Sequence, residues 1–525
     1  MARDVTGRLI LRGTLVARTP LHVGGLGDDV DTDLPLARDG ASRLYTPGTS
    51  LAGALRQWCE ERFGVPLVDR IWGFQEDDRG DASHVFVEDA VIEGSDSVEV
   101  EIRDGVGIDR GTGAAAEHIK YDRAVLPRGT KLPLRLTIEI GQLHVRNQTL
   151  AMFAALRDAL VAGEVRLGAA KTRGLGRVNL QPNATISEQV FNTRAGILAT
   201  LKAGREGAPI PVNELEEALQ KHPPYEPPRL EITIDWEPLG PFMVKAGFDG
   251  IAVDMLPLMS GVDGKLALVL PGSSVKGALR SQAERIVRTL LERELSTETD
   301  PKRKFLLDVD LPLINEFFGL RGLSADDSMN RTDGISTNGP LPGLSALCVD
   351  DCYAVRRLNS DHWQRVLAAE KDQDLRAALD GASLKHWQEA YHVAIDRWTG
   401  GAAESFLYTM LEPHWVEWEP LRLTIDLARI ANNHRSPAVS LLLLVLRDLA
   451  AGRLPLGFAT HRGMGSVNVS KIRVAAKGTD GPLKGLDGII YENGQPMEIL
   501  AQSRADLNQH WQAWIASALK KVGAA

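Results

Sequence analysis

Hydrophobic and polar residues alternate along several stretches of the chain, which predicts β-strands. The clearest stretches are GRLILRGTLVA at residues 7–17 and RLEITIDWE at residues 229–237. A period of two places side chains of one kind on one face of a strand. Two later stretches, PLRLTIEI at 133–140 and PLRLTIDL at 420–427, are nearly identical to each other. The strand pattern therefore occurs in two matching sets.

Helical patterns accompany both sets of strands. They predict helices at about residues 50–63, 148–162, 274–294 and 437–451. The first helix of each set follows a Pro-Gly step, after which Ser and Thr are expected to supply N-cap oxygens to the first turn. The second helices end alike, in LRDALVAG and LRDLAAG, so Gly163 and Gly452 are expected as C-caps.

Three motifs recur in the same order, which indicates a duplicated folding unit. They pair YTPGTSLAGALR (45–56) with VLPGSSVKGALR (269–280), GVGIDRGTGAAAE (105–117) with HVAIDRWTGGAAE (392–404), and LGAAKTRGLGRVNL (167–180) with LGFATHRGMGSVNV (456–469). We call the two copies the first and the second repeat.

Each repeat follows the order strand, helix, strand, strand, helix, strand, which is that of split β-α-β-β-α-β folds. The sequence therefore predicts an α+β protein with two tandem ferredoxin-like (RRM-like) modules. The expected division is a first module at 1–181, a proline-rich linker at 182–228, a second module at 229–475 and a C-terminal tail at 476–525 with one tryptophan-bearing helix. The second repeat is roughly 60 residues longer, which we assign to a lobe inserted at about 295–385.

Composition excludes several classes of protein. The chain has 525 residues, 44% hydrophobic and 25% charged, as in globular proteins with more than one core. No stretch approaches the roughly 20 apolar residues of a membrane span, and the N-terminus lacks a signal-peptide core. A net charge of −9 argues against indiscriminate nucleic-acid binding but permits a local basic groove. Cys59, Cys348 and Cys352 have no metal-site spacing and are expected as reduced thiols, which fits the cytoplasm.

Two glycine-rich turns are candidate phosphate sites. They run from Lys171 to Gly176 and from Thr460 to Gly465. Glycines let backbone amides approach a phosphate closely, and neighbouring cations supply charge. The candidate side chains are Lys171, Arg173, His461 and Arg462. The alternative is a tight turn that needs positive φ.

The starts of the first helices are also candidate anion sites, because helix amides and hydroxyls can hold a phosphate there. The candidates are Thr49, Ser50 and Arg56 in the first repeat and Ser273, Ser274, Lys276 and Arg280 in the second. Ala52 occupies the position that matches Lys276. Plain helix capping is the alternative.

Taken together, these motifs resemble the RAMP superfamily of CRISPR systems, and within it the Cas-seven backbone subunits of type III effector complexes. The resemblance covers roughly residues 7–180 and 229–472 and includes Ile71-Trp72-Gly73 with Val85 to Ala90, and Phe317-Phe318-Gly319 with Ala346 to Asp351. The last segment lacks the family's alanine after the aspartate. Two such units in tandem resemble the double backbone protein of type III-D systems.

The resemblance implies a subunit that binds guide RNA along its phosphates and works with complementary target RNA and other CRISPR effector subunits. Its thumb-like hairpin would interrupt the guide–target duplex at intervals. Some such subunits cut target RNA with a loop aspartate and a divalent metal, Mg²⁺ or Mn²⁺. No membrane partner is implied.

An acidic loop in the first repeat offers candidates for that aspartate. It contains Asp28, Asp29, Asp31, Asp33 and Asp39. A carboxylate there could orient a metal ion or accept a proton from a ribose 2′-hydroxyl. The alternative is a solvated acidic loop.

The resemblance to the family indicates which aspartate of this acidic loop would be catalytic. In the family, the catalytic aspartate lies shortly before a proline. Asp33 has this position before Pro35, and Asp254 is the counterpart that we favour in the second repeat. Setting Pro35 opposite Pro257 places Asp254 against Thr32, so the internal alignment does not choose between Asp31 and Asp33. We favour Asp33 and Asp254 as catalytic and metal-binding residues, with Asp31 as the alternate.

The repeated Ile-Asp-Arg motifs (108–110 and 395–397) lead into Gly/Ala hairpins. We expect the Asp-Arg pair to brace a loop. The hairpins, with residues 117–121 and 406–408, are the candidate thumbs, because apolar tips can wedge bases apart. The alternative is ordinary strand positions that face a core.

Three functions remain, in order of preference. The first is a guide-RNA-binding backbone subunit that cleaves complementary RNA with a divalent metal. The second is a structural RNA-binding subunit without chemistry. The third is a metal-independent endoribonuclease that processes guide RNA, which would need a positioned histidine such as His22 or His461.

Overall fold

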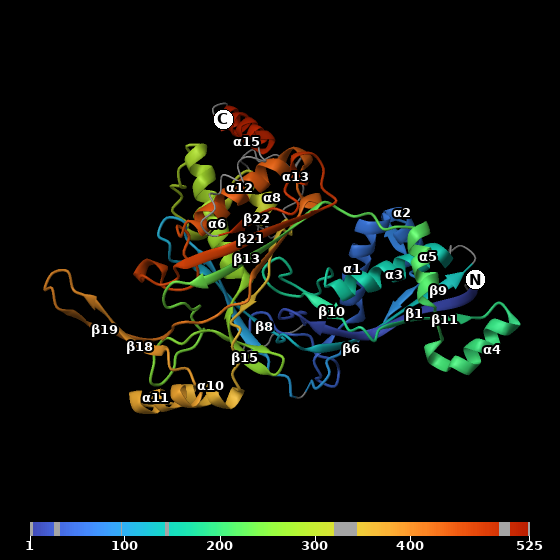
Figure 1. Cartoon of the computed structure of the whole chain (residues 1–525), viewed down its shortest axis with the longest axis horizontal. Helices are drawn as coiled ribbons and strands as arrows, with labels where there is room; N and C mark the ends of the chain where they lie inside the picture. The colour runs from blue at the N-terminus through green and yellow to red at the C-terminus, as the bar shows by residue number, and fades with distance from the viewer. Residues whose placement is uncertain are drawn as a thin grey trace. The chain divides into compact units, whose positions relative to one another are not determined.

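The computed structural model describes residues 4–25, 32–95, 97–141, 146–319, 344–492 and 505–522. The chain forms two compact units (Figure 1). Unit 1 comprises Met1–Arg103, Asp122–Lys171 and Leu175–Pro227. Unit 2 comprises Asp104–Tyr121, Thr172–Gly174 and Pro228–Ala525. Unit 2 therefore holds the second repeat together with two short segments of the first.

Unit 1 is built on a six-stranded antiparallel sheet in the order β12-β11-β1-β9-β5, with β10 also paired to β1. Its strands are β1 (Val5–Ala17), β5 (Val85–Val87), β9 (Lys131–Gly141), β10 (Val178–Leu180), β11 (Thr185–Val190) and β12 (Ala208–Pro209). The alternation of β1 buries Leu9, Leu11 and Leu15 against the helices. The predicted strands at 7–17 and 133–140 are confirmed.

Helices α1, α3 and α5 lie over one face of this sheet (Figure 1). The helices of unit 1 are α1 (Gly48–Phe63), α2 (Val65–Trp72), α3 (Arg146–Ala162), α4 (Arg194–Ala203) and α5 (Val212–Lys221). Short strands β2 (Tyr45–Thr46), β3 (Phe74–Glu76), β4 (Arg79–Asp81) and β6 (Ala90–Val91) complete the unit. A hairpin of β7 (Glu101–Ile108) and β8 (Ala115–Val125) starts and ends in unit 1, and its tip belongs to unit 2.

Unit 2 contains a five-stranded sheet in the order β16-β20-β13-β21-β22. Its strands are β13 (Arg229–Pro238), β16 (Leu347–Val349), β20 (Leu421–Asp426), β21 (Val467–Lys477) and β22 (Ile490–Glu492). A smaller sheet holds β14 (Met259–Val262), β15 (Lys265–Leu270) and β17 (Cys352–Tyr353). The strands β18 (Trp387–Ile395) and β19 (Ala402–Pro413) form a long hairpin that projects from the unit (Figure 1).

The helices of unit 2 include the two predicted at 274–294 and 437–451. They are α6 (Gly272–Leu290), α7 (Pro301–Val309), α8 (Ile314–Phe318), α10 (Ser360–Leu367), α11 (Asp372–Gly381), α12 (Asn432–Ala450), α13 (Gly481–Lys484) and α15 (Ala505–Val522). In the described part of the chain, each helix is too short or too polar to cross a bilayer.

The two main sheets share one strand order. The first strand, β1 or β13, lies between the third strand (β9 or β20) and the closing strands (β10 and β11, or β21). The second strand, β5 or β16, pairs with the outer side of the third. This is the strand order of a ferredoxin-like sheet, so the α+β fold class is confirmed.

The helix caps differ in part from the prediction. Neither α1 nor α6 has a side-chain cap from Ser or Thr. The amide of Gly48 donates to Asp89 Oδ1 at 2.6 Å, and the amide of Gly272 donates to Asp351 Oδ1 at 2.8 Å. Aspartates distant in sequence therefore satisfy these amides. Gly163 directly follows α3 with φ of 72°, as predicted for a C-cap, whereas the C-cap of α12 is Ala451 and Gly452 comes one residue later with φ of 69°.

Three predicted boundaries need correction. Residues 182–228, expected as a linker, contain β11, α4, β12 and α5, and α5 packs on α3 with Leu215 and Ala218 buried. Within the expected lobe at 295–385, strand β16 belongs to the main sheet of unit 2, because Leu347 pairs with Ile425. The expected tail supplies β22 to the same sheet, and α15 buries Trp511 against the core.

Candidate nucleic-acid interface and acidic loops

The two glycine-rich turns adopt the same backbone conformation. Four positions in or just before each turn have positive φ: Gly168, Ala170, Gly174 and Gly176 in the first repeat, and Gly457, Ala459, Gly463 and Gly465 in the second. The shared left-handed positions explain the recurring glycines, since non-glycine residues adopt this region at a cost. The tight-turn interpretation therefore accounts for these glycines, while phosphate binding stays a prediction.

The last glycine of each turn is also required by close packing. A Cβ atom on Gly176 would lie 2.1 Å from the carbonyl oxygen of Leu167, and one on Gly465 would lie 2.2 Å from that of Leu456. By contrast, a Cβ on Gly463 would meet no atom within 4 Å. The outer part of the second turn is thus open, and His461, Arg462 and Gly463 are all exposed there.

The arginine of each turn contacts a tyrosine of the adjacent hairpin. Arg173 Nη1 donates to the hydroxyl of Tyr121 at 3.0 Å. Arg462 Nη1 donates to the hydroxyl of Tyr408, and its guanidinium lies 5.5 Å from the centre of the tyrosine ring. Both arginines are exposed, so an exposed cation beside an aromatic ring occurs in both repeats.

Asp254 is held by the residue that follows this tyrosine. The Asp254 carboxylate oxygen Oδ2 accepts hydrogen bonds from the amide and the hydroxyl of Thr409, at 2.7 and 3.0 Å. The amide of Asp254 donates to the Thr409 hydroxyl at 3.0 Å. The next residue, Met255, forms a β-bridge with Met410 in strand β19. In the second repeat, Asp254 is therefore exposed and is held by hydrogen bonds against strand β19, which carries Tyr408.

Asp33 is held in the corresponding way in the first repeat. Its amide donates to Asp122 Oδ1 at 2.7 Å, and the Asp122 amide donates to Asp33 Oδ2 at 3.0 Å. Asp33 is exposed. Asp122 follows Tyr121 just as Thr409 follows Tyr408, so Asp33 and Asp254 occupy equivalent positions. Their catalytic role stays a prediction. Asp28, Asp29 and Asp31 lie outside the described residues.

Sequence reasoning did not identify Asp122 and Thr409. The signal was present, because the repeats align without gaps from the Ile-Asp-Arg motif to the PLRLTI strand, and this alignment sets Tyr121-Asp122 against Tyr408-Thr409. The two positions differ in chemistry. The first repeat has a second carboxylate beside Asp33, and the second repeat has a hydroxyl beside Asp254.

The donors around Asp33 and Asp254 fit a hard divalent cation. Carboxylate and hydroxyl oxygens are suitable Mg²⁺ ligands, and Mg²⁺ usually binds through one or two carboxylates while substrate phosphates and waters complete its shell. Within the described residues, no three His, Cys, Asp or Glu side chains come together as a metal group.

At the helix starts, the predicted hydroxyl groups lie near the surface. Thr49, Ser50 and Ser273 are exposed, and Ser274 is half-buried. The arginines farther along these helices are occupied. Arg56 donates to Glu60 at 2.7 Å and to Asp69 at 2.8 Å.

Arg280 is more deeply held than Arg56. It donates to Glu284 at 2.6 Å and to the carbonyl oxygens of Gly319 and Val309, at 2.6 and 3.0 Å. The contacts of Arg56 and Arg280 brace the helices, and neither arginine presents an unengaged charge to the surface.

Lys276 is buried, with 6% of its surface exposed. Its ammonium donates to the carbonyl oxygen of Leu347 at 2.8 Å, to that of Thr172 at 3.2 Å, and to the hydroxyl of Ser345. Burial lowers the pKa of Lys276 to about 7, and the nearby charges of Arg173 and Arg280 act in the same direction. The cation expected at the surface is therefore an interior group, which the fold does not present to a phosphate.

The Ile-Asp-Arg motifs separate into two roles. Asp109 Oδ1 accepts from the amides of Gly111 and Thr112 and from the Thr112 hydroxyl, at 2.7–3.0 Å. Asp396 accepts from two amides of its turn in the same manner. The aspartate braces the turn in both repeats. Arg110 does not pair with Asp109: its Nη1 donates to the carbonyl oxygen of Ile108 at 2.9 Å and its Nε to Glu284 of α6 at 2.5 Å, which corrects the expected Asp-Arg pair.

The hairpin β18–β19 exposes large apolar side chains. Phe406 and Leu407 are 61% and 64% exposed, and Trp398 at the turn is 96% exposed. The alternative that residues 406–408 face a core therefore does not hold for Phe406 and Leu407. In the first repeat, the side chains of residues 117 and 118 lie outside the described residues.

Histidines give little support to a metal-independent nuclease. His22 is 3% exposed, and its Nδ1 lies 2.7 Å from the carbonyl oxygen of Ala124. The ring is away from solvent, and this burial lowers the pKa of His22 and favours its neutral form. His461 is exposed, and the matching position of the first repeat is Thr172, not a histidine.

The chain combines two ferredoxin-like sheets, each with a glycine-rich turn and an aspartate loop. This combination defines a protein with two related modules. The family model of the RAMP superfamily matches residues 14–179 and 262–468, more than half of the chain. The chain therefore belongs to the RAMP superfamily. A curated relative is the CRISPR system Cms endoribonuclease Csm3 of Methanocaldococcus jannaschii, 34% identical over 77 residues. That match covers 14% of this chain and 28% of the relative.

Proposed function

We propose that the chain is a guide-RNA-binding backbone subunit of a type III CRISPR effector complex, a tandem fusion of two RAMP modules that cleaves complementary target RNA with a divalent metal. One observation carries this proposal. Asp33 and Asp254 occupy equivalent exposed positions, and each is fixed by the strand that carries a tyrosine bound to the arginine of a glycine-rich turn. The repeated set joins candidate chemistry to candidate RNA contacts.

The proposed RNA contacts are those groups that the fold leaves at the surface. They include the exposed Arg173, His461 and Arg462 of the turns, the half-buried Lys171, and the hydroxyl groups of Thr49, Ser50 and Ser273 at the helix starts. Arginine and hydroxyl groups donate to phosphate oxygens without reading sequence, which suits a backbone that must accept any guide. Because the chain as a whole carries a net charge of −9, RNA binding would be limited to the surface formed by these groups.

In the proposed chemistry, a divalent cation such as Mg²⁺ or Mn²⁺ would neutralise charge that develops on the scissile phosphate. Asp33 and Asp254 would hold it through the carboxylate oxygen that their hairpin partners leave unused. Asp122 and Thr409 would orient these carboxylates by the hydrogen bonds described above. Arg173 and Arg462 donate to the tyrosines that precede Asp122 and Thr409, and they would place the neighbouring phosphate.

Assembly with further subunits is supported by the difference between the two hairpins. In unit 2, the tip of the first hairpin is engaged, since Arg110 pairs with Glu284, whose side chain is 3% exposed. The second hairpin instead exposes Trp398, Phe406 and Leu407. Exposed apolar side chains on a projecting element are typical of interaction surfaces. A neighbouring RAMP subunit or the RNA duplex would cover them.

The test is target cleavage by the complex assembled on a guide RNA. A labelled complementary RNA and Mg²⁺ are supplied to wild type, Asp33→Asn, Asp254→Asn and the double variant. Asparagine retains an oxygen acceptor for the hairpin amide, so the loops should stay in place while the charge is lost. Asp249→Asn is the control, because Asp249 is an exposed aspartate of the same loop as Asp254 that pairs with Lys245. Each single variant should lose one product band, by about 100-fold or more.

Undiminished cleavage by the double variant would refute the assignment of these aspartates. Cleavage that persists in EDTA would favour the metal-independent nuclease. Guide binding without cleavage under any metal would support the structural subunit, which is the second candidate function because Arg–Tyr contacts and turns require no catalysis. Guide affinity should fall steeply with salt if several phosphates are held.

A further inference from the structure

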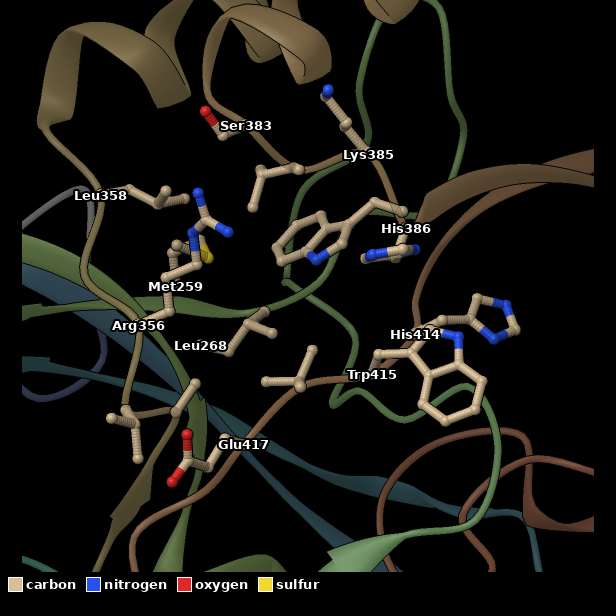
Figure 2. Close-up of a pocket in the computed structure, with 15 residues that line it drawn as sticks. Met259, Leu268, Arg356, Leu358, Ser383, Lys385, His386, His414, Trp415 and Glu417 are labelled. Carbon is tan, nitrogen blue, oxygen red and sulfur yellow. The ribbon is translucent and has the colours of Figure 1, made fainter.

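A pocket of about 270 Å³ lies at the base of the hairpin β18–β19 (Figure 2). Residues 383–387 lead into β18, and residues 414–417 follow β19. The two segments meet because Trp387 pairs with Pro413 at the base of the hairpin. The site is distinct from Asp254 and from the glycine-rich turns, none of which line it.

The inner part of this pocket is apolar. Met259 of β14, Leu268 of β15 and Leu358 supply aliphatic groups, and Trp387 supplies a largely buried indole. Trp387 is held in the core by an edge-to-face contact with Trp363, at 6.3 Å between ring centres. A rigid apolar floor of this kind accepts a flat ligand with little loss of side-chain entropy.

Trp415 at the rim is an unusual residue in two respects. Its side chain is 88% exposed, and its φ is 54°, in the left-handed region that bulky residues avoid. The strained backbone at Trp415 is not offset by packing of its side chain in the core. Backbone strain of this kind is found at ligand sites. In the first repeat, the matching position holds Arg128, so the feature belongs to the second repeat alone.

Polar groups surround the aromatic rings. In Figure 2, His386, His414 and Trp415 lie on one side of the pocket, and Arg356 lies on the opposite side. Arg356 is anchored by a hydrogen bond of 3.0 Å from its Nη2 to the carbonyl oxygen of Ala382. Lys385 is a second exposed cation. Among the lining residues, all of which are described, Glu417 is the one carboxylate.

We propose that this pocket takes one unstacked nucleobase together with its phosphate. The Trp415 indole and the imidazoles would stack on the base, because stacking on aromatic rings is how proteins hold splayed-out bases. Arg356 and Lys385 would hold the phosphate, and Glu417 would accept from an exocyclic amine of the base. The proposal rests on the proposed function, since an RNA strand guided along the hairpin would supply the nucleotide.

The same chemistry could come from a free nucleotide, so the test has two arms. Adenosine 5′-monophosphate binding is measured by equilibrium dialysis with the full chain. A single-stranded oligoribonucleotide with one 2-aminopurine, walked along its length, reports by fluorescence whether a base leaves the stack of its neighbours. Both arms use wild type, Trp415→Ala and Trp415→Phe. Trp398→Ala is the control, because Trp398 is 96% exposed at the far end of the same hairpin.

At one or a few 2-aminopurine positions, wild type should give a distinct fluorescence change. Trp415→Ala should abolish it or weaken binding at least about five-fold, while Trp415→Phe and Trp398→Ala retain it. The 5′-monophosphate bound without a signal from the RNA would assign the pocket to free nucleotides, and the reverse result would assign it to the strand. Both results support the pocket.

The proposal would be overturned if Trp415→Ala bound the monophosphate and changed the 2-aminopurine fluorescence as wild type does. It would also be overturned if wild type neither bound the monophosphate nor changed the fluorescence. RNA binding in a gel shift, with no signal from any labelled base and no binding of the monophosphate, would reject the pocket and leave the proposed function standing. Binding of the monophosphate by a chain that binds no RNA would reject the proposed function and leave the pocket standing.

Discussion

Replacing Lys276 with methionine should change the pH dependence of stability of unit 2. The ammonium is buried beside the carbonyl oxygens of Leu347 and Thr172, and burial lowers its pKa from 10.5 to about 7. In the unfolded chain the lysine returns to its ordinary value. Between pH 7 and about 10, the unfolded state therefore binds one proton more than the folded state. Stability rises with pH wherever this holds.

The magnitude follows from the width of that pH window. Each pH unit corresponds to about 1.4 kcal/mol, so three units from pH 7 to 10 give about 4 kcal/mol. Below pH 7 both states are protonated and the contribution of Lys276 is constant. The variant Lys276→Met has no such group. The free energy of unfolding of wild type minus that of the variant should thus increase by about 4 kcal/mol between pH 7 and 10.

The assay is urea unfolding followed by tryptophan fluorescence at several pH values. Apart from Trp58 and Trp72, all tryptophans of the chain lie in unit 2, so the signal reports mainly on this unit. Lys276→Leu serves as a second apolar variant, because a slope shared by both replacements comes from the lost amine and not from altered packing. Parallel stability profiles of wild type and both variants from pH 7 to 10 would refute the reasoning.

Two further predictions concern stability and can be measured by the same unfolding assay. Gly465→Ala should destabilise the protein by about 1–3 kcal/mol, because φ is 82° and the new Cβ would lie 2.2 Å from a carbonyl oxygen. Gly277→Ala is the matched control: it lies in open space on α6 and should stabilise the protein by about 0.5–1 kcal/mol. Equal effects of the two substitutions would contradict this prediction. Glu284→Gln should cost about 3–5 kcal/mol, because Arg110 and Arg280 would lose their shared buried carboxylate, and a cost below 1 kcal/mol would show that the pair is dispensable.

Local pattern was sufficient to predict the framework of the fold. The alternation at 7–17 and 229–237 reflects strands that bury one face, and the structure extends each by two residues or fewer. Helix starts after Pro-Gly and glycine C-caps depend on backbone conformation within a few residues. The order of motifs then sufficed for the strand order, because the chain builds the same kind of sheet twice, once in each repeat.

Contacts between distant residues could not be predicted from the sequence. Asp33 is positioned by a residue 89 positions away, and Asp254 by one 155 positions away. The expected Ser and Thr caps were wrong because Asp89 and Asp351 reach the helix amides from 41 and 79 positions away. The burial of Lys276 likewise depends on the tertiary neighbours of its amine.

The duplication separates what the fold requires from what each repeat can do. Positive φ at four matching positions and an arginine bonded to a tyrosine occur in both repeats, so they belong to the shared framework. Other matching positions differ in chemistry, among them Asp122 against Thr409, Ala52 against Lys276, and Arg128 against Trp415. These differences change charge, burial and stacking, and at Trp415 also the backbone conformation, since its φ is 54°. The two repeats are therefore one scaffold with two different surfaces, and any chemistry at Asp33 has a second carboxylate beside it that chemistry at Asp254 must do without.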